Sequence, residues 1–539
     1  MLGRAGLHLR TLPHLRPWQI LGRIIAPLRR KISSKVEVPR NVSGHLEPSV
    51  PFLQHEPWNT RDEILTGRFC FLNRTEDLGH PIDWHPANLP LLWRFNLHYF
   101  HFVHLLEPDE QVRCCRSWVD SNGSRRTMAW HPYPTSHRIV NWCKANLADS
   151  DLRESLYAQA AHLARNLETY VYGNHLIENA RALVFAGVFF DGAGESGHWL
   201  QKGLDILRTE ADEQILPDGG HYERSPMYHA LMLEAYADVL NILPPGDPNT
   251  LWLEPLIARM STALHSMMHP DGDIALFNDA TLEIAPPASE LLTYVEQLGV
   301  VFEKPSPRRD LPATGYFVSE SDRIFLMVDG GPAGPEHLMA HAHADIFSFE
   351  LSLDGYRFIV DSGVYEYQEG ERRDYSRSSA AHNTVAIDGQ DQIECWGSFR
   401  VGRRAAPHNV RMRRENGLAT FEGVFSGYGK IVGDGIEHRR SIRVDHREKR
   451  IIVHDEILGR GRHRVESRVH FHPEVTIEKG ASIRLARGDA ACRLEVLQGQ
   501  LRWEETAYYP QFGVEQQREC AVIGGVVDLP VTIEYGIWY

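Results

Sequence analysis

The sequence has few of the features that mark specialised classes of protein. Its seven cysteines are scattered and include no Cys-x-x-Cys pair, so a disulfide framework is not expected. No apolar run reaches the ~20 residues that a membrane-spanning helix requires. The net charge of −14 argues against general nucleic-acid binding, although one cleft of an acidic protein can be locally basic. Internal repeats and low-complexity tracts are also absent.

What remains is the composition of an ordinary globular protein, with 42% apolar and 24% charged residues. A chain of 539 residues is too long for one hydrophobic core, so two or three domains are expected. The apolar pattern predicts an α+β multidomain protein. Its parts are a basic leader (1–50), a helical domain (51–303), a linker (304–314) and a β-rich domain (315–539).

The leader is unusual because eight basic residues precede the first acidic one. They are Arg4, Arg10, Arg16, Arg23, Arg29, Arg30, Lys31 and Lys35. The apolar residues between them do not form the continuous core of a standard secretory signal. One interpretation is an amphipathic segment that touches an anionic membrane surface. The other is a basic, partly disordered leader that packs on the body of the protein, and the loosely helical spacing favours it.

Helical periodicity dominates from about Leu91 to Leu298. Apolar residues recur every three or four positions, most clearly over 176–188, 232–240 and 253–264. Loops rich in proline and glycine separate these segments. Several helical hairpins in series predict a bundle or an α/α toroid, which is an incomplete barrel of helices.

After the proline-rich linker the period changes to two. Arg323–Val328 reads as a strand, and the segments 347–353 and 356–360 flank Asp354-Gly355, a dipeptide typical of tight hairpin turns. Short alternating segments continue to Tyr539 with almost no helical pattern. An antiparallel β-sandwich is therefore expected for this half.

The densest group of potential ligands lies in the β-rich half. His341 and His343 are two residues apart, Asp361 follows 18 residues after the second, and His382 lies 21 beyond that. If these positions meet, two histidines and a carboxylate can hold zinc and leave one histidine for chemistry. Equally, His341 and His343 could both bind metal, or His343, Asp361 and His382 could be three unrelated polar residues at strand ends.

Two further groups lie in the helical half. Asn174 and Glu178 share one face of a predicted helix, and Glu178 is three residues from His175, close enough to orient its imidazole. Tyr228 lies where a polar loop meets a long apolar helix, so its hydroxyl could project into a cleft. The structural alternatives are a capping asparagine with a surface ion pair, and a tyrosine packed inward.

Aromatic and polar residues alternate near the front of the helical half, over 93–99 and 130–142. Rings stack on the apolar faces of sugars, and arginine binds carboxylate or sulfate through two parallel hydrogen bonds. The predicted substrate-binding residues are Trp93, Arg94, His98, Tyr133, Arg138 and Trp142. An aromatic-rich helix interface would produce the same pattern.

Taken together, these motifs resemble the heparinase II/III-like polysaccharide lyases, a family related to alginate and heparan lyases. The resemblance covers most of the chain from about residue 50. It is carried by Asn174-His175 with Glu178, the segment 225–229, His341-x-His343-x-Asp345, Asp361-Ser362-Gly363 and His382-Asn383-Thr384-Val385. It implies an α/α toroid followed by an antiparallel β-sandwich, in agreement with the periodicity.

The resemblance implies β-elimination on a uronic-acid polysaccharide. Asn174 would neutralise the substrate carboxylate with help from His175, Tyr228 would act as base, acid or both, and His341 would be the second acid/base group. Glu178 matches a supporting acid. Tyr365 or Tyr375 is expected to add a hydroxyl.

The resemblance also implies a Zn²⁺ with a structural role, held by His343, Asp361 and His382. The expected partner is an acidic polysaccharide, without nucleic acid or a transmembrane segment. The resemblance favours the periplasm or cell envelope, whereas the missing signal pattern leaves the cytoplasm open. The polymer, sulfate recognition, exo or endo action and oligomeric state are not encoded in any visible motif.

Two other functions remain compatible with the sequence. A glycoside hydrolase would need paired carboxylates, for which Glu178 with Asp218 or Glu223 are the candidates. A non-catalytic glycan-binding factor in exopolysaccharide assembly would keep the fold without the chemistry.

Overall fold

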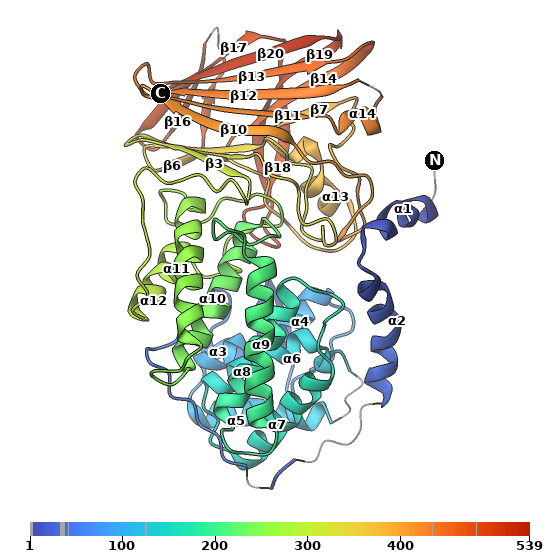
Figure 1. Ribbon diagram of the computed structural model, residues 1–539, viewed down its shortest axis with the longest axis vertical. Coiled ribbons are helices and arrows are strands. Elements are labelled where there is room, and N and C mark those ends of the chain that lie inside the picture. The colour runs from blue at the N-terminus through green and yellow to red at the C-terminus, as the bar shows by residue number, and fades with distance from the viewer. Residues whose placement is uncertain (1–3, 33–37, 41, 124–126, 434, 481) are drawn as a thin grey trace.

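The computed structural model describes residues 4–32, 38–40, 42–123, 127–433, 435–480 and 482–539, with the side chains at 27–32 left out. A helical half and a β half stack along the long axis of the molecule (Figure 1). This confirms the predicted fold class of an α/α toroid followed by an antiparallel β-sandwich. Within the described residues, no helix is both long enough and apolar enough to cross a bilayer.

The helical half is built mainly from pairs of antiparallel helices whose contacts are local in sequence. Its elements are α3 (Arg61–Leu65), α4 (Leu91–Tyr99), α5 (Pro108–Ser121), α6 (Pro132–Lys144), α7 (Ser150–Arg165), α8 (Asn174–Phe189), α9 (Ser196–Gln214), α10 (Pro226–Ile242), α11 (Thr250–Met267) and α12 (Ala288–Gln297). Helices α8 and α10 are buried almost all round. They therefore form the centre of this half and have no polar outer face.

The start of α10 shows how the sequence fixes a functional helix. Ser225 is the N-cap, and its hydroxyl accepts a hydrogen bond from the backbone N–H of Tyr228 (3.3 Å). Pro226 occupies the first turn, where its missing N–H costs nothing. These two residues place Tyr228 in the first turn of the helix, directly after the polar loop.

In the part of the chain that the structure describes, the β half contains three antiparallel sheets of four or more strands and a small two-stranded one, β8 (Cys395–Trp396) with β9 (Arg400–Val401). An eight-stranded sheet has the order β10-β11-β12-β13-β20-β17-β16-β15, and the two four-stranded sheets are β18-β19-β14-β7 and β3-β4-β5-β6. The strands are β3 (Tyr316–Glu320), β4 (Ile324–Asp329), β5 (Phe349–Leu353), β6 (Tyr356–Ile359), β7 (Val385–Ile387), β10 (His408–Glu415), β11 (Leu418–Phe425), β12 (Glu437–Asp445), β13 (Arg450–Leu458), β14 (Arg462–His470), β15 (Thr476–Glu478), β16 (Ile483–Arg487), β17 (Ala490–Gln498), β18 (Leu501–Tyr508), β19 (Gln516–Asp528) and β20 (Val531–Trp538). The predicted hairpin is present: Leu353 pairs with Tyr356, and Asp354 and Gly355 both have positive φ.

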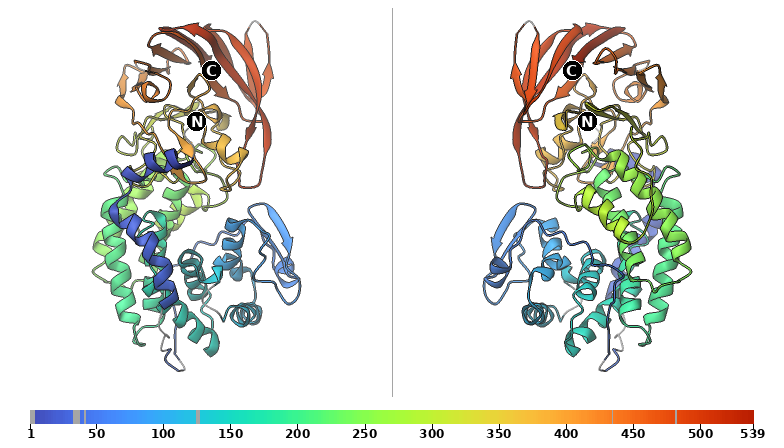
Figure 2. Two further views of the ribbon diagram at one scale, coloured as in Figure 1. Left: turned by 90° about the vertical axis from the view of Figure 1, so that its right-hand side faces the viewer. Right: turned by 90° about the vertical axis from the view of Figure 1, so that its left-hand side faces the viewer.

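Two local features depart from the expected pattern. A two-stranded hairpin, β1 (Arg68–Phe71) and β2 (Arg74–Asp77), precedes the long helices. The β half also contains short helices, α13 (Glu371–Arg377) and α14 (Tyr428–Ile431). The β1–β2 hairpin extends toward the β half (Figure 2). At its turn the Asn73 side chain donates to the carbonyl of Phe512 (2.9 Å).

A separate hydrophobic core joins the two halves. It combines residues of α11 with residues of β3 and β4, including Met267, Tyr316 and Phe325. Beside it His269 donates to the Glu350 carboxylate (2.7 Å), a fully buried pair that links the end of α11 to β5. The halves are therefore fixed against each other, and the loop after α11 is held at their boundary.

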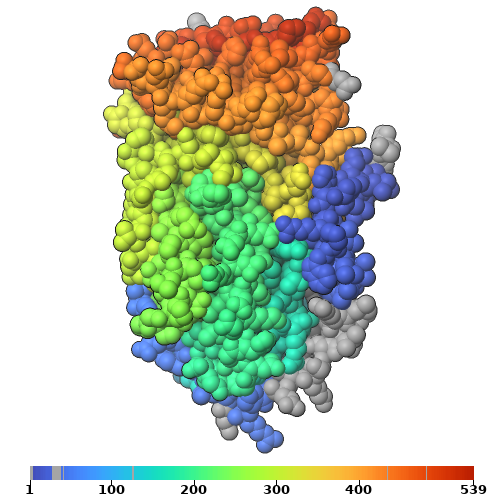
Figure 3. Space-filling model, in the orientation of Figure 1, coloured from blue at the N-terminus to red at the C-terminus, as the bar shows by residue number. Residues whose placement is uncertain are grey.

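The N-terminal segment packs on the body of the protein. Helices α1 (Arg4–Thr11) and α2 (Pro17–Ile32) run along one flank, from the sandwich to the helical half (Figures 1 and 3). Arg10 pairs with Glu394 of the β half (2.6 Å), and Arg16 pairs with Glu213 of the helical half (2.5 Å). Packing on the body is the interpretation that the sequence favoured; Lys35 lies outside the described residues.

Candidate active site

A large cleft lies between the two halves, with a volume of about 1800 Å³. Its walls come from α4, α6, α8 and α10 on the helical side and from the loops at 337–341 and 365–372 on the β side. Residues of α1 and α2 complete the lining. All of the predicted catalytic residues, Asn174, His175, Tyr228 and His341, face this space.

Tyr228 and His341 are brought together from opposite halves of the molecule. Their ring centroids are 3.9 Å apart, and the rings are inclined by 32°. Asn174 completes the group, because its Nδ2 lies 3.5 Å from Nε2 of His341. Asn174 opens α8 directly after Gly173, which has φ +64 and where a Cβ would lie 2.1 Å from the Glu223 carboxylate. Glycine is therefore required at 173 for the chain to bring Asn174 to this position.

Asp279 fixes the orientation of His341. It lies in the loop after α11, and its Oδ2 accepts a hydrogen bond from Nδ1 of His341 (2.9 Å). The same carboxylate accepts from both terminal nitrogens of Arg373 and from Nε2 of His343 (2.8 Å). Burial alone would raise the pKa of Asp279, but Arg373 and the two histidines hold it well below its usual range. Asp279 is therefore a fixed anion, and Nε2 of His341 is left facing the cleft.

The tyrosine that contacts Tyr228 is Tyr367. The two hydroxyls are 3.2 Å apart, and the guanidinium of Arg373 lies over the Tyr367 ring, 4.9 Å from its centroid. Burial raises the pKa of Tyr228 well above 10, and Tyr367 raises it further. Tyr228 is therefore a neutral phenol that can donate a proton. The sequence had indicated Tyr365 or Tyr375 for this supporting role; Tyr365 lines the cleft, but Tyr375 donates to the carbonyl of Ala507 (3.3 Å).

Glu168, and not Glu178, orients His175. Nδ1 of His175 lies 3.2 Å from the Glu168 carboxylate, and the ring stacks on Tyr133 with centroids 4.1 Å apart. Burial opposes a charged imidazole, but the buried carboxylate of Glu168 outweighs it and raises the pKa of His175. The site thus places a readily protonated histidine next to Asn174. The expectation that Glu178 would orient His175 is wrong, because Glu168 makes the contact; the charge of Glu178 adds only a smaller contribution to the raised pKa of His175.

Glu178 belongs to a buried ionic group on the floor of the cleft. It pairs with Arg181 (3.3 Å), which also contacts Asp238, and Asp238 pairs with Lys144 (2.6 Å). Burial raises the pKa of Glu178, and Asp238 adds to this effect while Arg181 opposes it. The group ties α6, α8 and α10 together below the reacting groups.

The predicted sugar-binding residues are only partly in the cleft. Trp93 and Tyr133 are among the residues that line it. Arg138 is fully buried against Trp118 and Gln159, His98 accepts from the Trp118 indole (3.1 Å), and Trp142 is fully buried. These three side chains, and Arg94, lie outside the lining of the cleft. For these four residues the helices were predicted correctly but the face was wrong: Asn96 and Tyr99 of α4, and His137 and Asn141 of α6, line the cleft, as does His101 just after α4.

A second cluster of chemistry-bearing residues lies behind His341. Among the described residues, only His343, Asp345 and His382 are grouped closely enough to hold a metal ion, with one ligand atom from each within 4.8 Å of the others. All three are buried, and each has a polar atom without a hydrogen-bond partner in the described chain: Nδ1, Oδ1 and Nε2, respectively. Two imidazoles and a carboxylate are a donor set suited to zinc.

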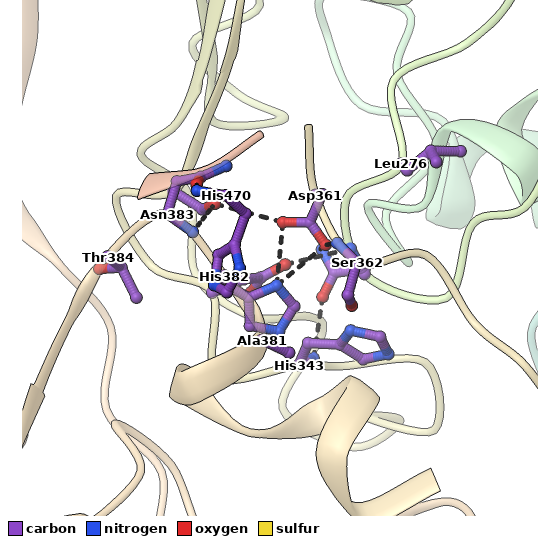
Figure 4. A network of polar contacts seen from close by, with 12 residues as sticks. Leu276, His343, Asp361, Ser362, Ala381, His382, Asn383, Thr384 and His470 are labelled. Carbon is purple, nitrogen blue, oxygen red and sulfur yellow. Dashed lines mark hydrogen bonds and ion pairs between the residues drawn. The ribbon is translucent and has the colours of Figure 1, made fainter. Parts of the chain in front are cut away.

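The surroundings of this cluster also fit a metal. Asp361 lies with both oxygens 2.9 Å from Nδ1 of His382 (Figure 4), and Asp279 accepts from Nε2 of His343. Carboxylates commonly hold the second nitrogen of metal-binding histidines in this way. Burial lowers the pKa of His343 to about 3, which keeps the ring neutral as a ligand must be. In this arrangement Asp345 takes the place among the ligands that the sequence reading gave to Asp361, and Asp361 orients His382.

Comparison with known proteins agrees with this architecture. The family model described as "Heparinase II/III N-terminus" matches residues 109–302. A second family model, described as "Heparinase II/III-like, C-terminal", matches residues 303–532. A heparin-sulfate lyase of Bacteroides stercoris is 28% identical over 302 residues, which are 49% of this chain and 45% of that protein. The chain thus matches less than half the length of that relative.

A wider but weaker match is FtsZ-localized protein C of Caulobacter vibrioides, 23% identical over 402 residues, or 71% of this chain and 66% of that protein. Among solved structures, a crystal structure of heparinase III superimposes with a TM-score of 0.67 at 18% identity, covering 85% of this chain and 78% of that one. The structural likeness shows the fold. Because the two family models together cover residues 109–532, the chain belongs to the heparinase II/III-like family.

Proposed function

We propose that the protein is a polysaccharide lyase that cleaves a uronic-acid polysaccharide by β-elimination and leaves unsaturated uronate ends. The observation that carries the proposal is the convergence of Asn174, Tyr228 and His341 in the cleft between the two halves. Family membership and the heparin-sulfate lyases among the relatives support it.

The geometry supports distinct roles for the two acid/base groups. Because Nδ1 of His341 donates to Asp279, Nε2 is the ring nitrogen that faces the cleft, and in its unprotonated form it can accept the proton from the carbon next to the uronate carboxylate. The electron pair left behind becomes an enolate. Tyr228, kept neutral by burial, can then protonate the oxygen of the departing 4-linked sugar as the carbon–carbon double bond forms.

Asn174 and His175 suit the substrate carboxylate. The extra negative charge of the intermediate develops on the carboxylate oxygens, where an amide donor and a nearby imidazolium stabilise it as an oxyanion hole does. Glu168 raises the pKa of His175 and so favours the charged imidazole that would stabilise the intermediate. Together they would lower the barrier to removing a weakly acidic proton.

Zinc at His343, Asp345 and His382, with Asp361 behind His382, has a structural role in this proposal. A bound Zn²⁺ would neutralise a buried group of carboxylates and fix the loop that carries His341. Elimination consumes no water, so a metal-activated hydroxide is not required. Asp279 bonds to both His341 and His343, and a stable metal site would thereby help to hold the reacting imidazole.

The alternative of a hydrolase is not favoured by the arrangement of carboxylates. Asp218 accepts hydrogen bonds from the backbone N–H groups of Ala313 and Thr314, so its carboxylate holds a loop outside the cleft. Glu178 is engaged with Arg181, and Glu223 accepts from Asn174 (3.2 Å). Glu178 and Glu223 are therefore both engaged by other residues. They do not form the pair of available carboxylates, one on each side of the scissile bond, that a hydrolase requires.

The test is digestion of a panel of polymers, with heparan sulfate, alginate and a bacterial uronate exopolysaccharide each incubated with the protein. The ultraviolet absorbance of unsaturated uronate should rise with at least one polymer. New reducing ends without that absorbance would indicate a hydrolase. Binding without new ends on any polymer would indicate a glycan-binding protein.

A further inference from the structure

We propose that the N-terminal segment is a wall of the substrate cleft and that Arg23 of α2, together with Arg400 of the β half, binds an anionic group of the polysaccharide. The group is a carboxylate or a sulfate. The identity of the ligand rests on the proposed lyase function. The segment lies before residue 109, where the family-model matches begin.

The segment is firmly attached to both halves near the cleft. The Trp396 indole donates to the hydroxyl of Thr11 (3.1 Å), and the amide of Gln19, which is fully buried, donates to the carbonyl of His337 (3.2 Å). Thr11, Leu15 and Arg23 all line the cleft. The contacts hold the segment in place as part of the binding surface.

Arg23 differs from the other described arginines of this segment. Arg4, Arg10 and Arg16 each pair with a carboxylate: Glu369, Glu394 and Glu213. Neither Arg23 nor Arg400 makes an ion pair with any residue that the structure describes, although both line the cleft. Two arginine side chains that line a cavity and have no ion-pair partner in the described chain form a ready site for a planar anion.

The two guanidinium groups also act on each other. Both side chains line the same cleft; burial lowers the pKa of Arg23, and the positive charge of Arg400 lowers it further. The guanidinium of Arg400 rests over the Trp396 ring, 4.8 Å from its centroid, which limits its freedom to move away. An anion between the two arginines would replace this repulsion by attraction.

The hairpin that carries Arg400 connects the site to the reaction centre. It is formed by β8 (Cys395–Trp396) and β9 (Arg400–Val401), and the carbonyl of Ser398 in its turn accepts from Arg373 (2.8 Å). The Phe399 ring lies 6.2 Å from that of His341 and 5.2 Å from that of Tyr367. An anion held by Arg400 would therefore belong to a sugar close to the bond being cleaved.

The experiment measures binding separately from turnover. Arg23→Gln, Arg400→Gln and the double variant are prepared in the full chain, alone and in a Tyr228→Phe background that stops turnover. The matched control is Arg439→Gln, an exposed arginine on β12 of the sandwich that removes the same charge away from the cleft. The probes are size-defined oligosaccharides of heparan sulfate, of the same material after desulfation, and of alginate.

The dissociation constant of at least one probe should rise ~10-fold for each cleft variant, the scale of a hydrogen bond to a charged group, and should stay unchanged for Arg439→Gln. In active protein, KM should rise by a similar factor with kcat within ~2-fold. A loss confined to the sulfated probe identifies sulfate; an equal loss with desulfated material or alginate identifies carboxylate.

Unchanged affinity in the double variant, a loss equal to that of the control, or failure of every probe to bind would overturn the proposal. Circular dichroism and the melting temperature of each variant show whether the fold is kept. Arginine-dependent binding without unsaturated products from the unmodified protein would leave the anion site standing and refute the lyase function instead.

Discussion

The contact between Tyr228 and Tyr367 gives the sharpest prediction about the reaction centre. Replacing Tyr228 with phenylalanine removes the proposed acid and should lower kcat by ~100-fold, the usual scale for loss of general acid–base catalysis. Replacing Tyr367 removes only the 3.2 Å hydrogen bond between the two hydroxyls. A neutral hydrogen bond contributes about 1 kcal/mol, so Tyr367→Phe should cost only ~5-fold.

The double variant separates a positioning role from an independent one. If Tyr367 acts through Tyr228, the double variant should be no slower than Tyr228→Phe alone, because the hydroxyl to be positioned is already missing. The assay is the initial rate of unsaturated product formation at saturating polymer. Tyr375→Phe serves as the control, since its hydroxyl bonds to a backbone carbonyl outside the cleft. Multiplicative losses, or an active Tyr228→Phe enzyme, would refute the reasoning.

Three further predictions address the neighbouring residues. Glu168→Gln removes the charge that raises the pKa of His175, so the fall of kcat/KM on the alkaline side should begin at lower pH. An unshifted pH profile would contradict the role of His175 in stabilising the substrate carboxylate. His382→Ala should abolish bound zinc, measured by elemental mass spectrometry, and lower the melting temperature, whereas equal zinc content in both proteins would contradict the metal site. Arg138→Met should destabilise the fold while leaving KM within ~2-fold, because Arg138 is buried against Trp118. A large rise in KM would instead indicate that Arg138 binds substrate.

Most of the architecture could be predicted because it is encoded locally. Apolar residues at helical spacing mark α8, α10 and α11, and the Asp354-Gly355 turn between alternating segments marks the β5–β6 hairpin. The catalytic group could be predicted for a different reason. Asn174, Tyr228 and His341 belong to short motifs whose order along the chain resembles that of one family. The cleft then confirmed that these distant motifs meet.

The residues that sequence reasoning missed share a common cause. Asp279, Tyr367 and Glu168 lie in irregular segments, where no periodicity indicates which side chain points inward. Their partners are up to 139 residues away, as for Tyr367 and Tyr228. The sequence nevertheless contains a signal for Asp279, because the polar pair Asn278-Asp279 directly follows a short apolar segment near the boundary between the two domains.

The errors on the aromatic helices have a physical origin too. Helices α4 and α6 are covered on several sides, so polar residues such as Arg138 and His98 occur in the core, where Arg138 donates to Gln159 and Nδ1 of His98 accepts from Trp118. Successive residues on a helix are rotated by ~100°, and one position therefore separates the cleft from the core. Composition located the correct helices, but only the packed structure shows which face reaches the substrate.

The most direct test of the account is a digestion carried out in water enriched in ¹⁸O, with the products analysed by mass spectrometry. β-Elimination breaks the carbon–oxygen bond without adding water, so the account predicts unsaturated ends that carry no label from the bond-breaking step. Saturated ends with one ¹⁸O atom for each bond cleaved would show hydrolysis and contradict the assignment of Tyr228 and His341 to elimination.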